Sequence, residues 1–208
     1  MAEKKKQFFS NDTNLLYQLY GEPPTLKLSG VPMHRHVRMT PLQDTETKIY
    51  AVKPYGTVLD TCTGLGYTAI YAARMKEVIK VITTEKDANV IEIAKMNKYS
   101  NELFESKKIE LINADISEKI TEFKDELFDV IIHDPPTFVR AVELYTLKFY
   151  AQLFRVLKRG GRLWHYCPDP GKMTAPSRLK ERIIKNLKLV GFINLIYDEN
   201  SSGVIAQK

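Results

Sequence analysis

The chain has 208 residues and a formal net charge of +6 at pH 7, with 44% hydrophobic and 27% charged residues. This length and composition suit a single globular domain with a sizeable core. No apolar run reaches the length of a membrane span, and residues 1–6 are charged without the apolar stretch of a secretory signal. We therefore expect a cytoplasmic protein, and the positive charge favours a polyanionic partner.

Residues 1–50 do not share the regular pattern of the remaining chain. Residues 21–24 (Gly-Glu-Pro-Pro) predict a break, and residues 26–32 suit either a small hairpin or an extended arm. Residues 45–52 predict a short helix. Between these segments lies a dense patch of hydrogen-bond donors within five positions: His34, Arg35, His36 and Arg38.

Residues 57–68 predict the ligand-binding corner of a parallel sheet. A short buried strand ends at Asp60, the turn Gly64-x-Gly66 follows, and a helix begins directly after it. Glycines let the backbone approach a ligand closely, and the first turn of a helix presents free N–H groups. Because an alanine follows three residues after Gly66, the turn also fits a dinucleotide site, in which Glu85 would hold ribose hydroxyls. A plain tight turn between strand and helix is the third interpretation.

Strand and helix patterns alternate through the rest of the chain. Further strands are predicted at residues 78–83, 109–112, 128–132, 162–166, 192–197 and 204–207. Helices are predicted at residues 88–99, 116–123, 143–157 and 176–189, of which 143–157 is the longest and ends at Gly160-Gly161. The last two strands are too close for a helical crossover and must pair antiparallel. The fold class is therefore α/β: a doubly wound, Rossmann-like seven-stranded sheet whose last strand is antiparallel.

Acidic side chains stand at the carboxyl ends of the first four predicted strands: Asp60, Glu85, Asp115 and Asp134. In an open parallel sheet, ligands bind outside these strand ends. Turn preference accounts for an aspartate at any one of these positions, but it accounts poorly for four in succession. The sequence therefore predicts a binding site that runs across the ends of the four strands.

The segment from Asp60 to Gly66 (Asp-Thr-Cys-Thr-Gly-Leu-Gly) resembles the first motif of class I S-adenosylmethionine-dependent methyltransferases, and the strand order is similar to theirs. In that family the motif surrounds the amino-acid part of the cofactor, which is zwitterionic and tolerates a nearby carboxylate. The resemblance extends from residue 57 to the C-terminus. It implies a catalytic domain over residues 51–208, preceded by an N-terminal arm or extension, residues 1–50, that contributes to substrate binding.

The resemblance also implies S-adenosylmethionine as the cofactor and assigns roles to its neighbours. Glu85 would accept from both ribose hydroxyls, Asp115 would accept from the adenine amine, and Ile116 would pack on the adenine ring. The cofactor-binding residues that it implies are Asp60, Thr63, Gly64, Gly66, Tyr67, Thr68, Glu85, Lys86, Asp115 and Ile116.

Residues 134–138, Asp-Pro-Pro-Thr-Phe, resemble the (Asp/Asn/Ser)-Pro-Pro-(aromatic) motif of enzymes that methylate exocyclic or amide nitrogens. Such an amine is a poor nucleophile because its lone pair is delocalised. The Asp134 carboxylate and the Pro135 carbonyl can accept its two N–H groups and aim the lone pair, while the prolines stiffen the loop. The sequence departs from the motif at Thr137, and the aromatic Phe138 comes one position later. The catalytic residues that the resemblance implies are Asp134, Pro135, Pro136 and Phe138.

The expected substrate is an exocyclic base amine in structured RNA: ribosomal RNA first, transfer RNA second, and cytosine N4 as the atom. The side chains expected to bind this RNA are His34, Arg35, His36, Arg38, Arg140 and Lys172. Phe9 or Tyr145 could stack on the base in place of Phe138. No His or Cys cluster has metal-ligand spacing. Cys62 and Cys167 are expected to be separate buried thiols, because two strand spacings, roughly 9–10 Å, lie between them.

Two alternatives remain open. The same fold could act on a small amine or a protein amide, as a methyltransferase or an aminopropyltransferase-like enzyme. Such aminopropyl-transferring relatives have a more glycine-rich first loop and acidic polyamine pockets, which the net charge of +6 disfavours. The chain could also be a non-catalytic module that binds nucleotide or RNA, although the intact acidic set and the Asp-Pro-Pro sequence argue against this.

Overall fold

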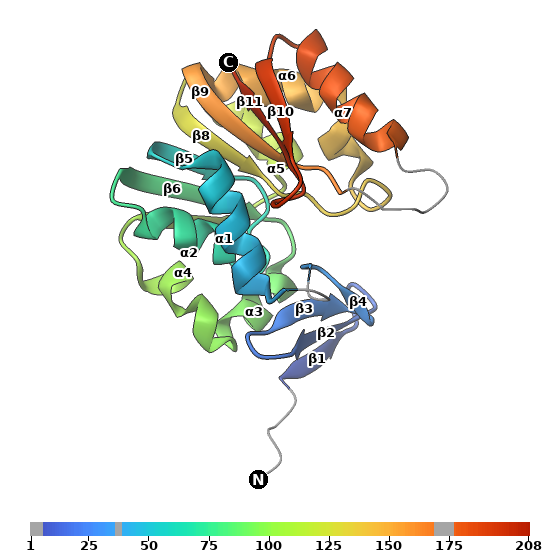
Figure 1. Cartoon of the computed structure of the whole chain (residues 1–208). Coiled ribbons are helices and arrows are strands. Elements are labelled where there is room, and N and C mark those ends of the chain that lie inside the picture. The colour runs from blue at the N-terminus through green and yellow to red at the C-terminus, as the bar shows by residue number, and fades with distance from the viewer. Residues whose placement is uncertain (1–5, 36–38, 169–176) are drawn as a thin grey trace.

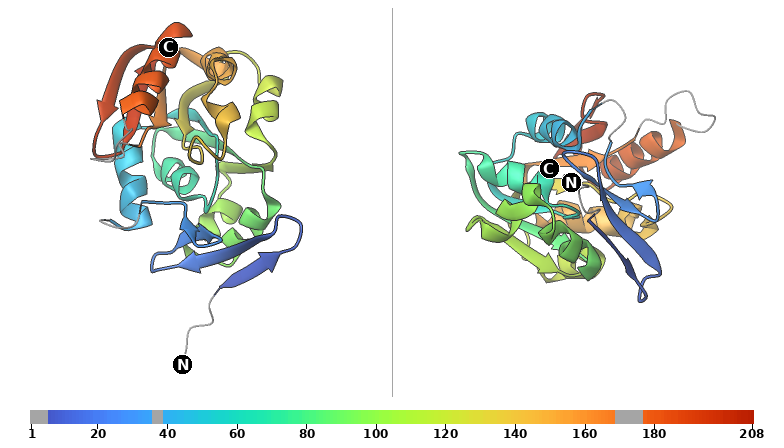
Figure 2. Two further views of the ribbon diagram at one scale, coloured as in Figure 1. Left: turned by 90° about the vertical axis from the view of Figure 1, so that its right-hand side faces the viewer. Right: turned by 90° about the horizontal axis from the view of Figure 1, so that it is seen from below.

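The computed structural model describes residues 6–35, 39–168 and 177–208. It contains a four-stranded antiparallel sheet near the N-terminus and a seven-stranded sheet with helices on both faces (Figure 1). The smaller sheet lies at one end of the molecule, next to helix α3 (Ala88–Lys95), and the perpendicular views show the same arrangement (Figure 2).

The large sheet has the strand order β10-β11-β9-β8-β5-β6-β7. Its strands are β5 (Gly56–Asp60), β6 (Val78–Glu85), β7 (Ile109–Asn113), β8 (Phe128–His133), β9 (Leu157–Tyr166), β10 (Ile193–Asp198) and β11 (Gly203–Gln207). Strands β5 to β9 are parallel, whereas β11 runs antiparallel to both β9 and β10. This topology confirms the predicted doubly wound α/β fold with an antiparallel last strand.

The central strand β8 is covered on both faces, since Phe128, Val130, Ile131 and Ile132 are 0% exposed. A parallel sheet needs helices on both faces to bury such a run. One layer consists of α1 (Pro41–Val52), α2 (Tyr67–Arg74) and α4 (Asn101–Glu105). The opposite layer consists of α5 (Ile116–Lys119), α6 (Leu147–Val156) and α7 (Ser177–Leu189). Within the described ranges, no helix combines the length and apolarity needed to cross a bilayer.

The predicted helix over residues 143–157 is interrupted in the structure. It consists of a 3₁₀ turn, η3 (Val142–Tyr145), and the separate helix α6, whose 10 residues make it shorter than α7 with 13. The interruption falls at Thr146, which has extended backbone and caps α6 through its side-chain oxygen. The prediction that Gly160-Gly161 ends this helix is wrong, because β9 begins directly after α6 and contains both glycines.

Three other predicted helices have different bounds in the structure. Helix α1 begins at Pro41, before the predicted residues 45–52, because Thr40 and Gln43 form a capping box. The α-helical part of residues 88–99 ends with α3, and a 3₁₀ turn, η1 (Lys98–Ser100), follows. Residues 116–123 form α5 and a second 3₁₀ turn, η2 (Ile120–Glu122).

The N-terminal sheet has the strand order β1-β2-β3-β4. Its strands are β1 (Gln7–Ser10), β2 (Leu15–Tyr20), β3 (Thr25–Leu28) and β4 (Val31–Pro32). Strands β3 and β4 form the hairpin that is one of the two alternatives predicted for residues 26–32. Strands β1 and β2 were not predicted, and they extend this hairpin into a sheet.

The inner face of the N-terminal sheet packs on the glycine turn and on α3. Tyr17 and Leu26 from this sheet form one buried cluster with Leu65 of the turn and with the apolar face of α3. The Tyr17 hydroxyl also donates to the carboxylate of Asp87, which caps α3. Helix α1 crosses the predicted boundary between residues 50 and 51. The division into an arm and a catalytic domain stays a prediction.

Candidate functional site

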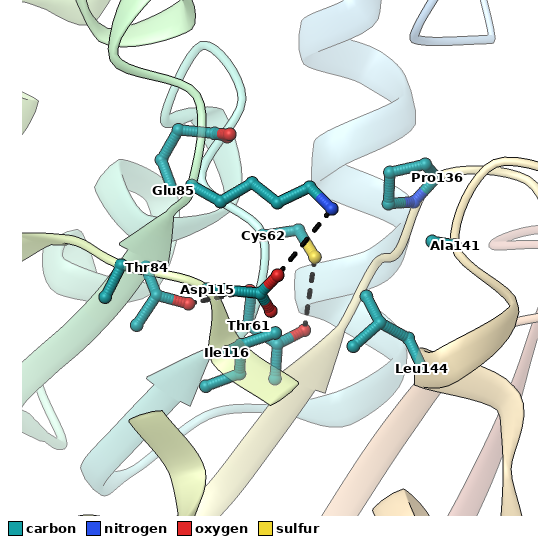
Figure 3. A pocket seen from close by; sticks show the side chains of 11 residues that line it. Thr61, Cys62, Thr84, Glu85, Asp115, Ile116, Pro136, Ala141 and Leu144 are labelled. Carbon is teal, nitrogen blue, oxygen red and sulfur yellow. Dashed lines mark hydrogen bonds and ion pairs between the residues drawn. The ribbon is translucent and has the colours of Figure 1, made fainter. Parts of the chain in front are cut away.

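A pocket opens at the carboxyl ends of β5, β6, β7 and β8, which is the edge that the acidic residues predicted (Figure 3). Its walls are formed by Thr61, Cys62, Thr84, Glu85, Lys86, Ala114, Asp115, Ile116, Pro136, Ala141 and Leu144. Four predicted cofactor residues and one predicted catalytic residue line it: Glu85, Lys86, Asp115, Ile116 and Pro136. The apolar wall from Ala141 and Leu144 was missed. Leu144 lies in the turn η3, where a regular helix was predicted from residue 143, and Ala141 precedes this turn.

The two glycines of the turn after β5 serve different purposes. Gly64 has a φ of +53°, and a Cβ placed on it would meet no atom within 4 Å. Gly66 has a φ of +79°, and a Cβ there would lie 2.7 Å from the Leu103 side chain. Positive φ favours glycine at both positions. Only Gly64 leaves open space for a ligand, whereas Gly66 allows close packing inside the protein.

Glu85 ends β6 and connects this strand to the glycine turn. Its carboxylate accepts hydrogen bonds from the backbone N–H of Gly64 at 3.0 Å and of Asp87 at 3.1 Å. Burial raises the pKa of the Glu85 carboxyl, and the backbone donors act against this rise. An ionised carboxylate has about four lone-pair sites. Two backbone bonds therefore leave acceptor capacity for the hydroxyls of a ribose.

Asp115 and Ile116 form the wall of the pocket that follows β7. Asp115 accepts from the backbone N–H of Ser117 at 2.8 Å, and Lys86 Nζ lies 3.7 Å from its carboxylate. Lys86 lies equally far, 3.7 Å, from the carboxylate of Glu143. Burial opposes ionisation of Asp115, but Ser117 and Lys86 outweigh it and lower the pKa of this carboxyl. The buried Ile116 adds the apolar surface that a purine ring needs.

Four of the predicted cofactor residues point into the protein instead of lining the pocket: Asp60, Thr63, Tyr67 and Thr68. The Asp60 carboxylate accepts from Thr68 Oγ1 at 3.0 Å and from Thr83 Oγ1 at 2.6 Å. Because Thr83 donates to Asp60, its oxygen accepts from Thr63 Oγ1 at 2.6 Å. The Tyr67 hydroxyl donates at 2.8 Å to a carbonyl of the β2–β3 turn. Burial raises the pKa of Asp60 to about 7. The hydrogen bonds of these buried residues stabilise the glycine turn on the side that faces the protein interior.

Asp134 directly follows β8, and an ion pair with α1 fixes its side chain. Lys48 Nζ donates to Asp134 Oδ2 at 2.6 Å and lies 2.8 Å from Asp44 Oδ2. Burial raises the pKa of the Asp134 carboxyl, and Lys48 acts against this rise. Burial works against the charge of Lys48, but the two carboxylates outweigh it and raise its pKa. Sequence reasoning missed Lys48 because it lies 86 residues from Asp134; its only local signal is the i,i+4 spacing from Asp44.

An aromatic side chain fixes the Pro-Pro loop, residues 134–138, through a hydrogen bond. The hydroxyl of the buried Tyr145 donates to the Pro136 carbonyl at 2.8 Å. The Phe138 ring lies 5.4 Å from the Tyr145 ring in an edge-on contact, and the Arg182 guanidinium lies 5.0 Å from the Phe138 centroid. Tyr145 is therefore a packing residue, whereas Phe138 is partly exposed and Phe9 on β1 is 54% exposed.

The predicted substrate-binding residues occupy different environments. The His34 ring packs 5.3 Å from the Tyr67 ring, in the contact between the N-terminal sheet and α2. The Arg35 guanidinium donates within the chain, including a 2.7 Å bond to Ser202 Oγ. Arg140 is exposed directly after the Pro-Pro loop. Three of the predicted residues lie outside the described ranges: His36, Arg38 and Lys172.

Both cysteines are free thiols, as the strand spacing predicted. Cys167 is buried, whereas Cys62 is partly exposed on the pocket wall, contrary to the expectation that both are buried. In the part of the chain that the structure describes, no group of three His, Cys, Asp or Glu side chains could hold a metal ion.

The donors and acceptors around the pocket suit S-adenosylmethionine. Glu85 offers an acceptor for a ribose, Asp115 offers an acceptor for an adenine amine, and Ile116 offers a surface for the ring. Open space beside Gly64 leaves room for the amino-acid end of S-adenosylmethionine. A dinucleotide would bring a pyrophosphate close to the carboxylates of Glu85 and Asp115, and repulsion between like charges disfavours this. The site therefore fits the sulfonium cofactor better than a dinucleotide.

Comparisons with known sequences agree with this geometry. A family model described as methyltransferase small domain matches residues 46–187. An uncharacterised protein of Methanocaldococcus jannaschii is 49% identical over 188 residues, which cover 89% of this chain but only 64% of that relative. A release factor glutamine methyltransferase of Clostridium acetobutylicum is 30% identical over 51% of this chain and 38% of its own length. A polyamine aminopropyltransferase of Saccharolobus islandicus is 34% identical over 57% of this chain and 40% of its own.

Solved structures share the fold at low sequence identity. Spermidine synthase in complex with a transition state analogue superposes with a TM-score of 0.76 at 22% identity, covering 97% of this chain and 72% of that chain. A methyltransferase dependent on S-adenosylmethionine from Aquifex aeolicus gives a TM-score of 0.56 at 21% identity, covering 79% of this chain and 88% of that chain. The broader coverage of the first match includes the N-terminal sheet.

The family match covers more than half of the chain and spans the glycine turn, the acidic strand ends and the Pro-Pro loop. The strand order and the pocket chemistry agree with it. The fold and the family imply S-adenosylmethionine as the cofactor, and the chain belongs to the methyltransferase small domain family.

Proposed function

We propose that the chain transfers the methyl group of S-adenosylmethionine to an exocyclic base amine in structured RNA. The observation that carries the proposal is the position of the loop after β8: Pro136 lines the cofactor pocket, and Asp134 lies beside it in a fixed ion pair. Ribosomal RNA is the first candidate substrate and transfer RNA the second, and cytosine N4 is the first candidate acceptor.

The chain's own residues would act by orienting the amine. When bound, S-adenosylmethionine supplies an electrophilic methyl group that needs an aimed lone pair more than a strong base. Asp134 and the Pro135 carbonyl accept the two N–H groups of the amine and bend its nitrogen toward tetrahedral geometry. The Pro136 carbonyl already accepts from Tyr145, which leaves Pro135 for this role. Once methylated, the cationic nitrogen is acidic enough to release its proton to water.

Positive charge near the loop supports an RNA substrate. Arg140 is exposed directly after the Pro-Pro loop, and the net charge of the whole chain is +6. Exposed cations at the rim of a site attract phosphates without selecting a sequence. The target base would then be chosen by the shape of the RNA and by the acceptors on the loop.

Aminopropyl transfer to a small amine is a second candidate. It is favoured by the superposition on spermidine synthase, which covers 97% of this chain and extends into the N-terminal sheet. A cationic polyamine would need excess negative charge around the acceptor site. Here Lys48 neutralises Asp134 and Arg35 neutralises Asp44. This balance of charge favours a neutral base amine over a polyamine.

The proposal predicts graded loss of activity in variants of Asp134. Asp134→Ala should lower the single-turnover rate of methylation on the order of 100-fold, because the amine loses one of its two acceptors. Asp134→Asn should retain partial activity, since an amide oxygen still accepts a hydrogen bond. Affinity for S-adenosylmethionine, measured by calorimetry, should change little in either variant. Equal loss of rate in both variants would instead indicate a general base and contradict the orienting role.

A matched control lies at the other end of the same strand. Asp125 precedes β8 and forms a surface ion pair with Arg155. Asp125→Ala should leave the rate of methylation unchanged.

The substrate itself is tested with labelled S-adenosylmethionine and total RNA, followed by analysis of the nucleosides. A parallel reaction contains decarboxylated S-adenosylmethionine and putrescine. A methylated exocyclic amine in the first reaction supports the proposal. An aminopropylated product in the second, with no methylated nucleoside in the first, would overturn it in favour of the second candidate.

A further inference from the structure

A buried lysine connects the loop after β8 to helix α1. The side chain of Lys48 is only 5% exposed, and its Nζ donates to Asp134 Oδ2 at 2.6 Å. On its other side, Nζ lies 2.8 Å from Asp44 Oδ2, and the Asp44 side chain is fully buried. The rings of Trp164 and Tyr166 also flank it, with centroids 5.5 Å and 5.8 Å from Nζ. The cation therefore has two carboxylates and two aromatic rings around it.

The chain of charges continues beyond Asp44 to Arg35, which follows the N-terminal sheet. Arg35 forms an ion pair with Asp44 through Nε. Its Nη1 donates to Ser202 Oγ at 2.7 Å and its Nη2 donates to the Asn200 carbonyl at 2.8 Å. Arg35, Asp44, Lys48 and Asp134 thus form one relay, which we call the charge relay. It is fixed at its outer end to the turn between β10 and β11.

Stability alone accounts poorly for this arrangement. Burying a charge is costly, and hydrophobic residues of similar volume often replace buried ion pairs with no loss of stability. Lys48 takes up one oxygen of Asp134, whereas the other oxygen stays available in the described part of the chain. An acceptor in a catalytic site must be held to within a fraction of an ångström of its productive position. A fixed cation on one oxygen provides this constraint on the other.

We propose that Lys48 is the positioning residue for Asp134: it holds the carboxylate charged and in one orientation, so that its second oxygen faces the acceptor amine. Asp44 and Arg35 hold Lys48 in turn. The inference rests on the proposed function, in which Asp134 accepts an N–H group of the substrate. Lys48 itself does not touch the substrate or the cofactor.

Several titratable groups act on Asp134, and the pH test must distinguish them. Besides the other members of the charge relay, these are Asp60, Cys62, Tyr145 and Tyr166. Burial raises the pKa of the thiol and of both phenols, so these three stay neutral over the working range of pH. The pKa of Asp60 is about 7, so Asp60 is the one further carboxyl whose titration must be separated from that of Asp134.

The first experiment measures Asp134 directly, without substrate. Carboxyl ¹³C NMR on aspartate-labelled protein, with Asp134→Asn and Asp60→Asn to assign the two signals, follows their titration. In Lys48→Met the pKa of the Asp134 carboxyl should rise, because burial loses its main opposing charge and only the weaker effect of Arg35 remains. In Lys48→Arg it should stay close to that of the wild type. An unchanged titration of Asp134 in Lys48→Met would overturn the inference.

The second experiment is a double-mutant cycle on the single-turnover rate. Lys48→Met should lower this rate on the order of 10- to 100-fold at pH 7, as expected for a misplaced catalytic group. In an Asp134→Asn background, the same change should lower the rate less than threefold, since Lys48 acts only through the carboxylate. The loss caused by Lys48→Met should grow as the pH falls, and Lys48→Arg should recover part of the rate.

The matched control is Lys158, whose Nζ pairs with Asp129 Oδ1 at 2.7 Å, away from the pocket. Lys158→Met should not change the rate or its pH dependence. If Lys48→Met unfolds the protein, the rates are measured on Lys48→Arg and on the double variant Lys48→Met/Asp134→Asn instead. Equal rate losses from Lys48→Met in both backgrounds would show a merely structural role and overturn the inference. A wild type that methylates no base amine would instead refute the proposed function, while the NMR titration would still decide whether Lys48 controls Asp134.

Discussion

The carboxylates at the four strand ends have different tasks, although the sequence presents them alike. Asp60 is buried among threonine hydroxyls, and Glu85 shares its oxygens with the backbone of the glycine turn. Asp115 remains partly exposed beside Lys86, and Asp134 is fixed by Lys48. The partners of these carboxylates therefore indicate different roles. Asp60 stabilises the protein interior, whereas Glu85 and Asp115 line the pocket and Asp134 lies beside it.

At the residue scale, Glu85 should control affinity for the cofactor. Glu85→Ala removes the carboxylate that we propose accepts from two ribose hydroxyls, and it also frees the Gly64 backbone N–H. Binding of S-adenosylmethionine should therefore weaken by about 2–4 kcal/mol. Isothermal titration calorimetry measures this loss. Glu110→Ala, on the neighbouring strand β7 and paired with Lys80 at the surface, is the matched control and should bind as the wild type does. Unchanged affinity in Glu85→Ala would rule out its contact with the ribose.

At the scale of elements, the N-terminal sheet and the glycine turn share one small core. Leu65 of the turn packs beneath Tyr17 and Leu26 of the sheet. The Tyr67 hydroxyl at the start of α2 bonds to the Pro24 carbonyl of the extension at 2.8 Å. Residues 6–35 therefore support the cofactor site from behind, independently of any contact with substrate.

The contact between sheet and helix should depend on the Tyr17 hydroxyl. This hydroxyl donates to Asp87 and lies 3.0 Å from Thr13 Oγ1. Tyr17→Phe keeps the ring but leaves Asp87 without this donor, so the free energy of unfolding should fall by about 1–3 kcal/mol. Urea denaturation measures the loss, and hydrogen exchange should show faster opening of β1 to β4. Tyr20→Phe, on the same strand with an exposed ring, should have no measurable effect; equal stability of both variants would contradict the role of Tyr17.

For the whole molecule, two neutral histidines on adjacent strands connect stability to pH. His133 and His165 pack with ring centroids 4.6 Å apart in the centre of the sheet. Burial lowers the pKa of both, that of His165 to about 4. The unfolded chain takes up protons on these histidines below about pH 6.5, whereas the folded chain does not. They therefore destabilise the folded state as the pH falls from 6.5 toward 4.

Asp60 acts in the opposite direction over almost the same range. Its pKa is about 7 in the folded chain and 3.8 ordinarily, so the folded state binds a proton that the unfolded state lacks. Asp60→Asn removes this compensation. As the pH falls from 7 to 4, the free energy of unfolding of the variant should fall relative to wild type by up to about 1.4 kcal/mol per pH unit. Urea denaturation at several pH values measures the two slopes, and parallel slopes would contradict the raised pKa of Asp60.

The sequence by itself determined the seven strand segments of the large sheet, the glycine turn and the acidic strand ends. Each of these is a local property: alternation of buried strands and amphipathic helices defines the sheet, and the residue that ends a strand is known once the strand is known. The same reasoning located Asp134, Pro135 and Pro136. It failed at Thr146, where a cap that competes with helix continuation divided one predicted helix into two.

Only the tertiary structure decided which side chains meet. Asp60 and Thr68 were predicted to bind the cofactor, but their side chains are buried and bonded to each other, because α2 packs against the end of β5. Arg35 was predicted to bind RNA but donates to Ser202, 167 residues away. Lys48 meets Asp134 across 86 residues. Local periodicity contains no information about pairs so distant in sequence, because only the packing of the folded chain brings them together.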